Sequence, residues 1–493
     1  MKTSMFDAAE VREALSRLPD VAAQESLHPP PLASVYVPLG HQKALSLDAS
    51  VVVGMRGAGK SLWTAVLNSD EHRQFVAGLA NSSVLSKAIV RVGFGLDEST
   101  TSFPSAPVLK AMVDEKIDAV ALWKWVVVRH ALDVTDLKRL LKEKNECDDW
   151  LTMARWCSDN PQLADELLSQ CDAALAAQGR VLLVVFDALD RLSEDWGVVR
   201  KLLAGALRFG LACRARRAVR LKFFLRPDME EDAGIWKFPD SSKLQHAKVE
   251  LEWRTADLYA LILTYLGNDE VVGSRFRKQA AKATGVSWQP REGVYAVPRE
   301  IIRGDKALRS VVEEIAGAWM GRSHKRGFTY TWVPTHLADA VGRVSPRSFL
   351  LTFKRAAVVT DETFGNHPYP LHFEGIQQGV ASASAIRIGE IKEDYPWVQP
   401  LLEAARGLSV PGKPEELLER WTKKEIDEVR AATKLPPRRF TTDPNRSGTK
   451  EVLIDDLVEL AVLYRTEDDR LNMPDIFRVG FGIKRKGGVK PPR

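Results

Sequence analysis

The sequence predicts an α/β fold, a mostly parallel sheet with helices on both faces. Three apolar, strand-like runs lead to this prediction. The first, "SVVV" at residues 50–53, precedes a glycine-rich turn and a helical segment. The second, "VLLVVF" at 181–186, ends at Asp187, and the third, "RLKFFL" at 220–225, ends at Arg226. Strands that alternate with helical segments in this way are typical of parallel sheets covered by helices.

The expected elements continue along the whole chain. A helix over residues 4–18 is followed by an extended connector at 28–38, where a proline run interrupts the helical spacing. We also expect strands at 88–94 and 247–253. Helical segments are expected over 61–80, from the end of the Pro/Ser/Thr-rich loop 96–108 to about 177, over 196–213 and over 255–359.

Composition narrows the class of protein. The chain of 493 residues has a net charge of +5 and is long enough for two or three domains. It has no apolar run of roughly 18 residues, and its first residues carry acids without an apolar core, so we expect neither a membrane span nor a secretory signal. The four cysteines lack metal-ligand spacing and are expected to be reduced thiols of a cytoplasmic protein: Cys147, Cys157, Cys171 and Cys213.

Two stretches are strongly basic: "RARRAVRLK" (214–222) and the tail from Arg478 to Arg493. A solvated basic face is the commoner explanation for such stretches, and binding of nucleic-acid phosphates is the alternative.

The turn after residues 50–53 carries the strongest motif. "GMRGAGKS" fits the pattern G-x-x-x-x-G-K-[ST], with a chance glycine-rich turn as the alternative. The glycines let backbone N–H groups turn toward a phosphate, and the start of the next helix adds its dipole. Lys60 would bridge the β- and γ-phosphates of a nucleotide, and the Ser61 hydroxyl would join a Mg²⁺ shell. The residues expected to bind the nucleotide are Gly54, Arg56, Gly57, Ala58, Gly59, Lys60, Ser61 and Leu62.

Two aspartates follow the second strand, in "FDALDRL". Asp187 lies at the carboxyl end of a strand, where ligands bind in open α/β sheets, and is expected to hold Mg²⁺ together with Ser61. Asp190 lies on the turn beyond and is expected to position an attacking water. The alternative for Asp190 is that it caps the helix that follows.

Arg226, at the end of the third strand, is expected to contact the γ-phosphate and to report its hydrolysis. The alternative is a simple ion pair with Asp228 or another surface acid.

Together, "GMRGAGKS", "VLLVVFDALDRL" and a strand that ends in arginine resemble the STAND branch of AAA-related P-loop ATPases, which includes NACHT- and KAP-type proteins. The resemblance implies a Mg²⁺-dependent ATPase with catalytic residues at Lys60, Asp187, Asp190 and Arg226. Many motor ATPases place glutamate directly after the metal-binding aspartate, and this chain differs because that position is Ala188.

A second resemblance concerns "SPRSFLLTFKRAA" (345–357), which is similar to the lid helix of origin-recognition-type ATPases. It implies a nucleotide contact by Arg347. Capping or pairing at a helix start is the alternative for this arginine. The resemblance covers about residues 46–357 and implies four regions: an N-terminal helix and connector (1–45), a P-loop core (46–255), a helical lid (256–380) and a winged-helix-like domain (381–493).

The interval between Lys60 and Asp187 is longer than a compact core of this type needs, so we expect a helical insertion at about 96–177. Within it, Trp123 and Trp125 are expected to pack in the core, with a partner-binding surface as the alternative.

The C-terminal segment 453–488 predicts a helix, a charged turn "TEDDR" and a short strand-and-turn end. This order resembles a winged helix-turn-helix, a module that such ATPases often carry after the lid. Winged helices bind either nucleic acid or protein, and here the basic residues that could face phosphates are Lys484, Arg485, Lys486 and Lys490.

These features favour an ATP-dependent switch, in which slow hydrolysis changes how the chain packs and what it binds. The resemblance suggests a protein effector or co-encoded subunit, leaves a homo-oligomer open, and suggests bacterial anti-phage defence as the setting. The alternative is a DNA-binding ATPase of origin-recognition or partition type that holds duplex through the basic C-terminus. A motor ATPase ranks lower because no arginine finger can be assigned, and a small-molecule kinase because of the large lid and C-terminal region.

Overall fold

The computed structural model describes residues 4–19, 28–96, 101–135, 137, 149–443 and 445–487. They form two compact units. The sheet unit contains the described parts of residues 25–32 and 37–252, and the helical unit contains those of residues 1–24, 33–36 and 253–493.

The sheet unit is built on five parallel strands in the order β2-β3-β4-β1-β5. Val53 at the end of β1 pairs with Leu225 at the end of β4, and β4 in turn pairs with β3. The carboxyl ends of these three strands therefore lie side by side at one edge. The strands are β1 (Val51–Val53), β2 (Ala88–Phe94), β3 (Val181–Phe186), β4 (Val219–Leu225) and β5 (Val249–Glu250).

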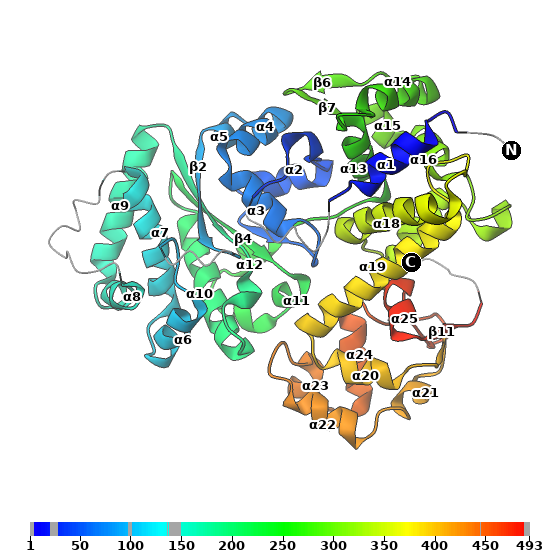
Figure 1. Cartoon of the computed structure of the whole chain (residues 1–493). Coiled ribbons are helices and arrows are strands. Elements are labelled where there is room, and N and C mark those ends of the chain that lie inside the picture. The colour runs from blue at the N-terminus through cyan, green and yellow to red at the C-terminus, as the bar shows by residue number, and fades with distance from the viewer. Residues whose placement is uncertain are drawn as a thin grey trace. The chain divides into compact units, whose positions relative to one another are not determined.

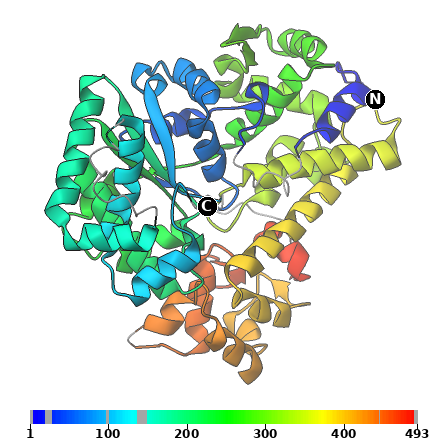
Figure 2. The ribbon, with the colours of Figure 1, turned by 60° about the vertical axis from the view of Figure 1, so that its left-hand side comes forward.

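Helices cover both faces of this sheet (Figures 1 and 2). Helices α3 and α4 lie on one side, and α7, α9 and α10 lie on the other. The helices are α2 (Leu39–Leu45), α3 (Lys60–Asn68), α4 (Asp70–Ala80), α5 (Ser83–Ser86), α6 (Ala106–Asp114), α7 (Ala119–Thr135), α8 (Trp150–Asp159), α9 (Pro161–Ala177), α10 (Trp196–Cys213), α11 (Pro227–Glu230) and α12 (Ser242–His246).

The structure confirms the α/β class and a parallel sheet with helices on both sides. One helical segment expected over 61–80 is two helices, because the chain turns to an extended conformation at Ser69 before α4 starts. The interval between β2 and β3 contains α6 to α9. In it, Trp123 and Trp125 are buried in the core of the unit, as the sequence predicted.

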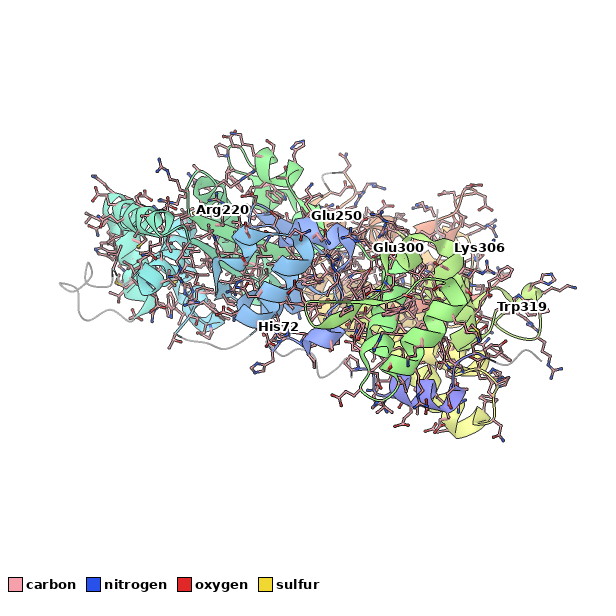
Figure 3. The ribbon with its side chains drawn as sticks, turned by 90° about the horizontal axis from the view of Figure 1, so that it is seen from above. His72, Arg220, Glu250, Glu300, Lys306 and Trp319 are labelled. Atoms are coloured by element: carbon pink, nitrogen blue, oxygen red, sulfur yellow. The ribbon has the colours of Figure 1, made fainter. Side chains whose placement is uncertain are left out.

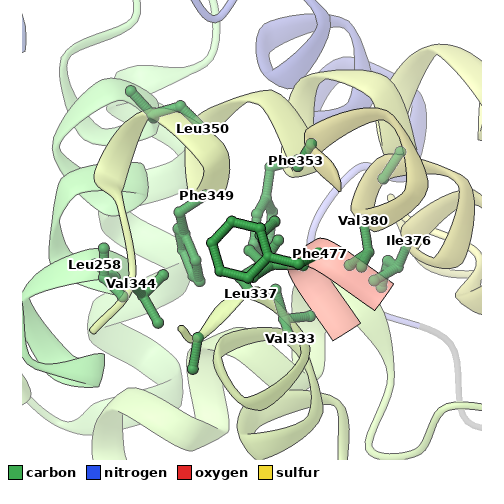
Figure 4. Close-up of a cluster of buried hydrophobic side chains, with 14 of the residues drawn as sticks. Leu258, Val333, Leu337, Val344, Phe349, Leu350, Phe353, Ile376, Val380 and Phe477 are labelled. Atoms are coloured by element: carbon green, nitrogen blue, oxygen red, sulfur yellow. The ribbon is translucent and has the colours of Figure 1, made fainter. Parts of the chain in front are cut away.

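The helical unit packs around α18 (Pro346–Phe364) and α19 (Phe373–Asp394). Gly375 allows their close approach, since a Cβ there would lie 2.7 Å from Thr360 Oγ1. Figure 4 shows Phe477 among side chains of both helices and of α17. The other helices of the helical unit are α1 (Ala8–Ser16), α13 (Thr255–Asn268), α14 (Gly273–Thr284), α15 (Arg299–Arg303), α16 (Asp305–Ala316), α17 (Thr329–Leu337), α20 (Val398–Ala404), α21 (Pro414–Leu418), α22 (Lys423–Ala431), α23 (Arg438–Thr442), α24 (Lys450–Glu459) and α25 (Asp475–Phe481).

Two features of this unit differ from the expected pattern. The segment expected to be helical from 255 to 359 also contains a hairpin of β6 (Gln289–Arg291) and β7 (Val294–Ala296). The boundary expected between 380 and 381 falls inside α19, so the predicted lid and C-terminal regions share one continuous helix.

The C-terminal region has the expected helix followed by a charged turn. After α24, β9 (Tyr464–Arg465) and β10 (Leu471–Asn472) form a hairpin around "TEDDR". Then α25 leads to β11 (Lys484–Arg485), which pairs in parallel with β8 (Ser409–Val410). The winged-helix assignment stays a prediction, and Lys490 lies outside the described residues.

Two further observations bear on the class of protein. Within the described ranges, no helix is both long and apolar enough to cross a bilayer. Cys157, Cys171 and Cys213 are buried thiols that form no disulfide among the described residues, and Cys147 lies outside the described residues.

Candidate functional site: the glycine-rich loop and the carboxyl edge of the sheet

The glycine-rich loop lies between β1 and α3. Gly57 and Gly59 have φ values of 80° and 102°, in the region where a Cβ is strained, so glycine is needed at both positions. The loop continues the sheet, because Gly54 N–H donates to Leu225 O at 3.0 Å. Ala58 is buried, whereas Arg56 and Leu62 are partly buried at the rim of the loop.

Lys60 is the first residue of α3, and its side chain turns back across the loop. Lys60 Nζ donates to Gly54 O at 2.7 Å and to Met55 O at 3.1 Å. Burial lowers the pKa of Lys60 to about 8, against the opposing effect of Asp187, which favours the charged form. The ammonium group is therefore held at the mouth of the loop by two backbone carbonyl oxygens.

A chain of buried hydrogen bonds connects helix α3 to the segment that follows β5. Trp63 is fully buried, and its Nε1 donates to His41 Nδ1 at 3.1 Å. His41 Nε2 then lies 3.1 Å from Glu252 O, just beyond β5. Sequence reasoning missed His41, because a single histidine on a short helix carries no motif.

Asp187 follows β3 directly, and its N–H donates to Phe94 O at 2.9 Å. The residue is only 2% exposed. Burial raises the pKa of Asp187, while a hydrogen bond from Ser61 and the charge of Lys60 act in the opposite direction. Asp187 Oδ1 is buried and has no hydrogen-bond partner among the described residues. A buried oxygen atom that accepts no hydrogen bond from the protein is typically satisfied by a bound water or a cation.

The fit to a magnesium ion follows from this geometry. The Ser61 hydroxyl and the Asp187 carboxylate are in contact, and both are hard oxygen ligands of the kind that Mg²⁺ prefers. In the described part of the chain, no cluster of three His, Cys, Asp or Glu side chains could hold a metal by itself. A Mg²⁺ ion at this position would therefore need phosphate and water oxygens to complete its shell.

Asp190 lies on the turn after Asp187. Ala188 adopts a left-handed conformation with φ of 52°, and a short 3₁₀ turn, Leu189–Arg191, follows. The cap of α10 is Asp195, which accepts a hydrogen bond from Gly197 N–H. The alternative sequence explanation, in which Asp190 caps this helix, is therefore not what the structure contains.

Asp190 instead faces Arg226, which ends β4. Arg226 Nη1 lies 3.4 Å from Asp190 Oδ2, and Arg226 Nε lies 3.1 Å from Asp228 Oδ1. Burial favours the neutral acid, but the charges of Arg226 and Lys60 hold the pKa of Asp190 below its ordinary value. Asp190 is therefore an ionised carboxylate beside the loop.

Asp228 adds a second acid that the sequence had offered only as an alternative partner for Arg226. It lies on α11, two residues beyond the arginine, and its Oδ2 is buried without a partner among the described residues. The spacing "RPD" was the available signal for it.

Arg347 belongs to the helical unit, whereas the residues above belong to the sheet unit. It lies in the first turn of α18, where Nη1 donates to Glu390 Oε1 at 3.1 Å. Glu390 also accepts from Arg387 at 2.9 Å. The pairing alternative is present, and a nucleotide contact by Arg347 stays a prediction.

The comparisons with known proteins add little to this geometry. No family model matches the chain, and no curated protein matches it. One solved structure that matches is titled "Structure of the Aeropyrum Pernix ORC2 protein (ADPNP-ADP complexes)", from Aeropyrum pernix. It is 11% identical with a TM-score of 0.38, and the match covers 93% of this chain and 95% of that one. The assignment of the site therefore rests on the residues described above.

Proposed function

We propose that the chain is a Mg²⁺-dependent ATPase that hydrolyses ATP slowly and uses its nucleotide state to control a partner protein. The observation that carries this proposal is the contact between the Ser61 hydroxyl and the buried Asp187 carboxylate, whose Oδ1 has no partner among the described residues. This pair lies beside Lys60 and the glycine-rich loop, at the edge where parallel sheets bind ligands.

Binding would use the loop and the start of α3. The backbone N–H groups between Gly54 and Ser61 would surround the β-phosphate, and the dipole of α3 would favour its negative charge. Lys60 would exchange its carbonyl partners for β- and γ-phosphate oxygens. Ser61 and Asp187 would hold Mg²⁺, which, when bound, neutralises charge on those oxygens.

Hydrolysis would depend on Asp190 and Arg226. A water oxygen forms a bond to the γ-phosphorus in line, as the bond to the β–γ bridging oxygen breaks and its electron pair leaves with ADP. Asp190 accepts a hydrogen bond from this water and orients it. Because its pKa is lowered, Asp190 is a weak base, so the water proton passes to the phosphate. Arg226 stabilises the charge that develops on the transferred group.

The same residues give a physical basis for a switch. Arg226 is shared between Asp190 and Asp228. A γ-phosphate would be a third anion competing for this guanidinium, and its release would return Arg226 to the two carboxylates. Because Arg226 ends β4 and Asp228 lies on α11, this exchange would move α11 relative to the turn after β3. Two nucleotide states would then present two surfaces to a partner.

The resemblance to STAND-type proteins supports a protein effector or co-encoded subunit, a cytoplasmic setting and a role in antiviral defence as the first cases to test. The DNA-binding alternative relied on a basic wing at the C-terminus. Of the basic residues of this wing, Arg485 donates to Asp475, which belongs to the same unit, at 2.7 Å. The turn of the β9–β10 hairpin carries the acids of "TEDDR".

Co-purification tests the switch. The chain is expressed with its genomic neighbours, and complexes are compared by size-exclusion chromatography with ATP, with ADP and without nucleotide. We expect a partner, or a second copy of the chain, to co-elute in one nucleotide state only. The Lys60→Ala variant should lose this dependence, and Lys43→Ala, an exposed lysine on α2, should retain it. Elution profiles that are identical in all nucleotide states would contradict the switch.

A further inference from the structure

The connection between α16 and α17, residues 317–328, combines exposed aromatic rings with basic side chains. We call it the aromatic-basic loop. Its sequence, "GAWMGRSHKRGF", contains no acid. Trp319 and Phe328 are 41% and 40% exposed, which places both among the large apolar side chains that remain on the surface. Figure 3 shows Trp319 at the margin of its unit.

The backbone places these two residues directly opposite each other. Trp319 and Phe328 form an isolated antiparallel bridge, in which Met320 N–H donates to Gly327 O at 3.0 Å and Thr329 N–H donates to Ala318 O at 3.1 Å. These hydrogen bonds flank the Trp319–Phe328 pair, so the two residues are a non-hydrogen-bonded pair, the type whose side chains lie closest on one face.

The base of the loop is anchored in the unit. The guanidinium of Arg309, on α16, stacks over the Phe328 ring at 4.4 Å from its centroid. Arg309 is itself oriented by Glu313, at 2.8 Å from its Nε. Thr329, immediately after the loop, is fully buried. The rings are therefore presented on a fixed base.

The tip of the loop is a cluster of positive charge. Arg322, His324, Lys325 and Arg326 are all exposed. The tip is ordered by a 3₁₀ turn, His324–Arg326, with Gly327 N–H donating to His324 O at 3.1 Å. In the described residues, no carboxylate forms an ion pair with Arg322, Lys325 or Arg326. Three permanent cations on one short turn without a counter-ion favour an anionic partner.

The positions of the cations and of the aromatic rings in the loop distinguish a membrane surface from a nucleic acid as the anionic partner. A loop that inserts into a membrane carries apolar side chains at its tip and basic ones behind them, at the level of the headgroups. Here the arrangement is reversed, because the cations form the tip and the rings form the base. Cations next to exposed rings match a polymer that carries phosphates and flat bases along one strand.

We propose that the aromatic-basic loop binds single-stranded nucleic acid. Arg322, Lys325 and Arg326 contact backbone phosphates, and a base stacks on Trp319 beside Phe328. This activity is independent of the proposed ATP site, which lies in the other unit.

Fluorescence anisotropy with the full chain tests the proposal. The probes are a labelled oligothymidylate of about 20 nucleotides and its oligouridylate counterpart. We expect saturable binding that weakens with salt, since each phosphate contact adds about 0.7 to the slope of log affinity against log salt for single strands. The triple variant R322Q/K325Q/R326Q should reduce that slope by about 2. Trp319→Ala should weaken binding roughly 5- to 100-fold, and Trp319→Phe, which keeps a ring, should retain most of it.

The matched control is R420Q/K423Q/K424Q, which removes the same charge from exposed residues elsewhere in the unit. The control should bind as the wild type does. Thermal melting and ATP binding should be unchanged in every loop variant, which separates loss of the loop from loss of the fold or of the proposed function. Equal losses in the loop triple and the control triple would overturn the proposal. So would binding of vesicles rich in anionic lipid with no binding of either oligonucleotide.

Discussion

Arg226 Nη1 lies 3.4 Å from Asp190 Oδ2, so the residue that ends β4 and the second aspartate after β3 form a pair across the edge of the sheet. The same guanidinium contacts Asp228 at 3.1 Å. Because one guanidinium pairs with both carboxylates, Arg226 connects Asp190, the proposed water-positioning residue, to Asp228 on helix α11.

Asp190→Asn should slow ATP hydrolysis by about 100-fold while leaving ATP affinity nearly unchanged. The amide oxygen accepts a hydrogen bond from the attacking water less strongly than the carboxylate does, while Lys60 and the glycine-rich loop, which would bind the phosphates, are unchanged. Filter binding and phosphate release separate the two quantities. Asp195→Asn is the control, because asparagine also caps a helix well, so α10 should persist and turnover should stay normal. Normal turnover in Asp190→Asn would show that this carboxylate does not position the water.

Asp187→Asn should abolish the Mg²⁺ dependence of hydrolysis and lower turnover by at least about 100-fold, since the amide is a weaker Mg²⁺ ligand than the buried carboxylate. Phosphate release over a Mg²⁺ titration measures this effect. Glu194→Gln, an exposed acid in the same segment, serves as the control and should behave as the wild type. An unaltered Mg²⁺ titration in Asp187→Asn would mean that another acid holds the metal.

Arg226→Gln should shift the acid limb of the turnover profile to higher pH. Asp190 must be ionised to orient water, and the charge of Arg226 helps to hold its pKa below the ordinary value. Removal of that charge raises the pKa, so activity is lost at a higher pH as the solution is acidified. Turnover measured over a pH series reports the limb. Arg208→Gln, exposed on α10, should leave the limb in place, and an identical limb in Arg226→Gln would contradict the coupling.

Lys222→Met tests how the segment before β1 is held. Lys222 is fully buried on β4, and its Nζ donates to the carbonyl oxygens of Ala44, Ser46 and Ala49 at 2.7, 2.9 and 2.7 Å. Methionine would leave these carbonyls without that donor, so the free energy of unfolding should fall by about 3 kcal/mol. Urea unfolding measures the change against Lys201→Met, an exposed lysine on α10. Equal stability of the two variants would show that the buried ammonium contributes nothing net.

The parts of this fold that the sequence predicts best are those with strong local patterns. The helix over 196–213 is present at those residues as α10, and the strand at 88–94 is present as β2, because long apolar runs with clear ends leave little choice of element. The helix expected over 61–80 broke at Ser69, where the serine and the following acids start a new helix that the apolar spacing alone does not reveal. The β6–β7 hairpin is not expected from the sequence. Its two-residue turn consists of Glu292 and Gly293, both with positive φ, and a Glu-Gly pair is only a weak signal for a turn of this type.

For the candidate site, the loop pattern selects Lys60 and Ser61 as candidates, because it fixes residue types at fixed positions, and the end of an apolar strand selects Asp187. Such patterns could not decide between alternatives that depend on the third dimension. The sequence offered Asp190 as the cap of the helix that follows, and only the path of the chain shows that Asp195 caps α10. The sharing of Arg226 between Asp190 and Asp228 depends on the pairing of β3 with β4, which no local pattern encodes.

The central claim is that the loop from Gly54 to Ser61 binds ATP through Lys60, and equilibrium titration with a fluorescent ATP analogue in the presence of Mg²⁺ tests it most directly. We predict saturable binding by the wild type and by Lys43→Ala, and roughly 100-fold weaker binding by Lys60→Ala, which loses about 3 kcal/mol of charge-assisted hydrogen bonding to phosphate. Equal affinity of Lys60→Ala and the wild type would contradict the account.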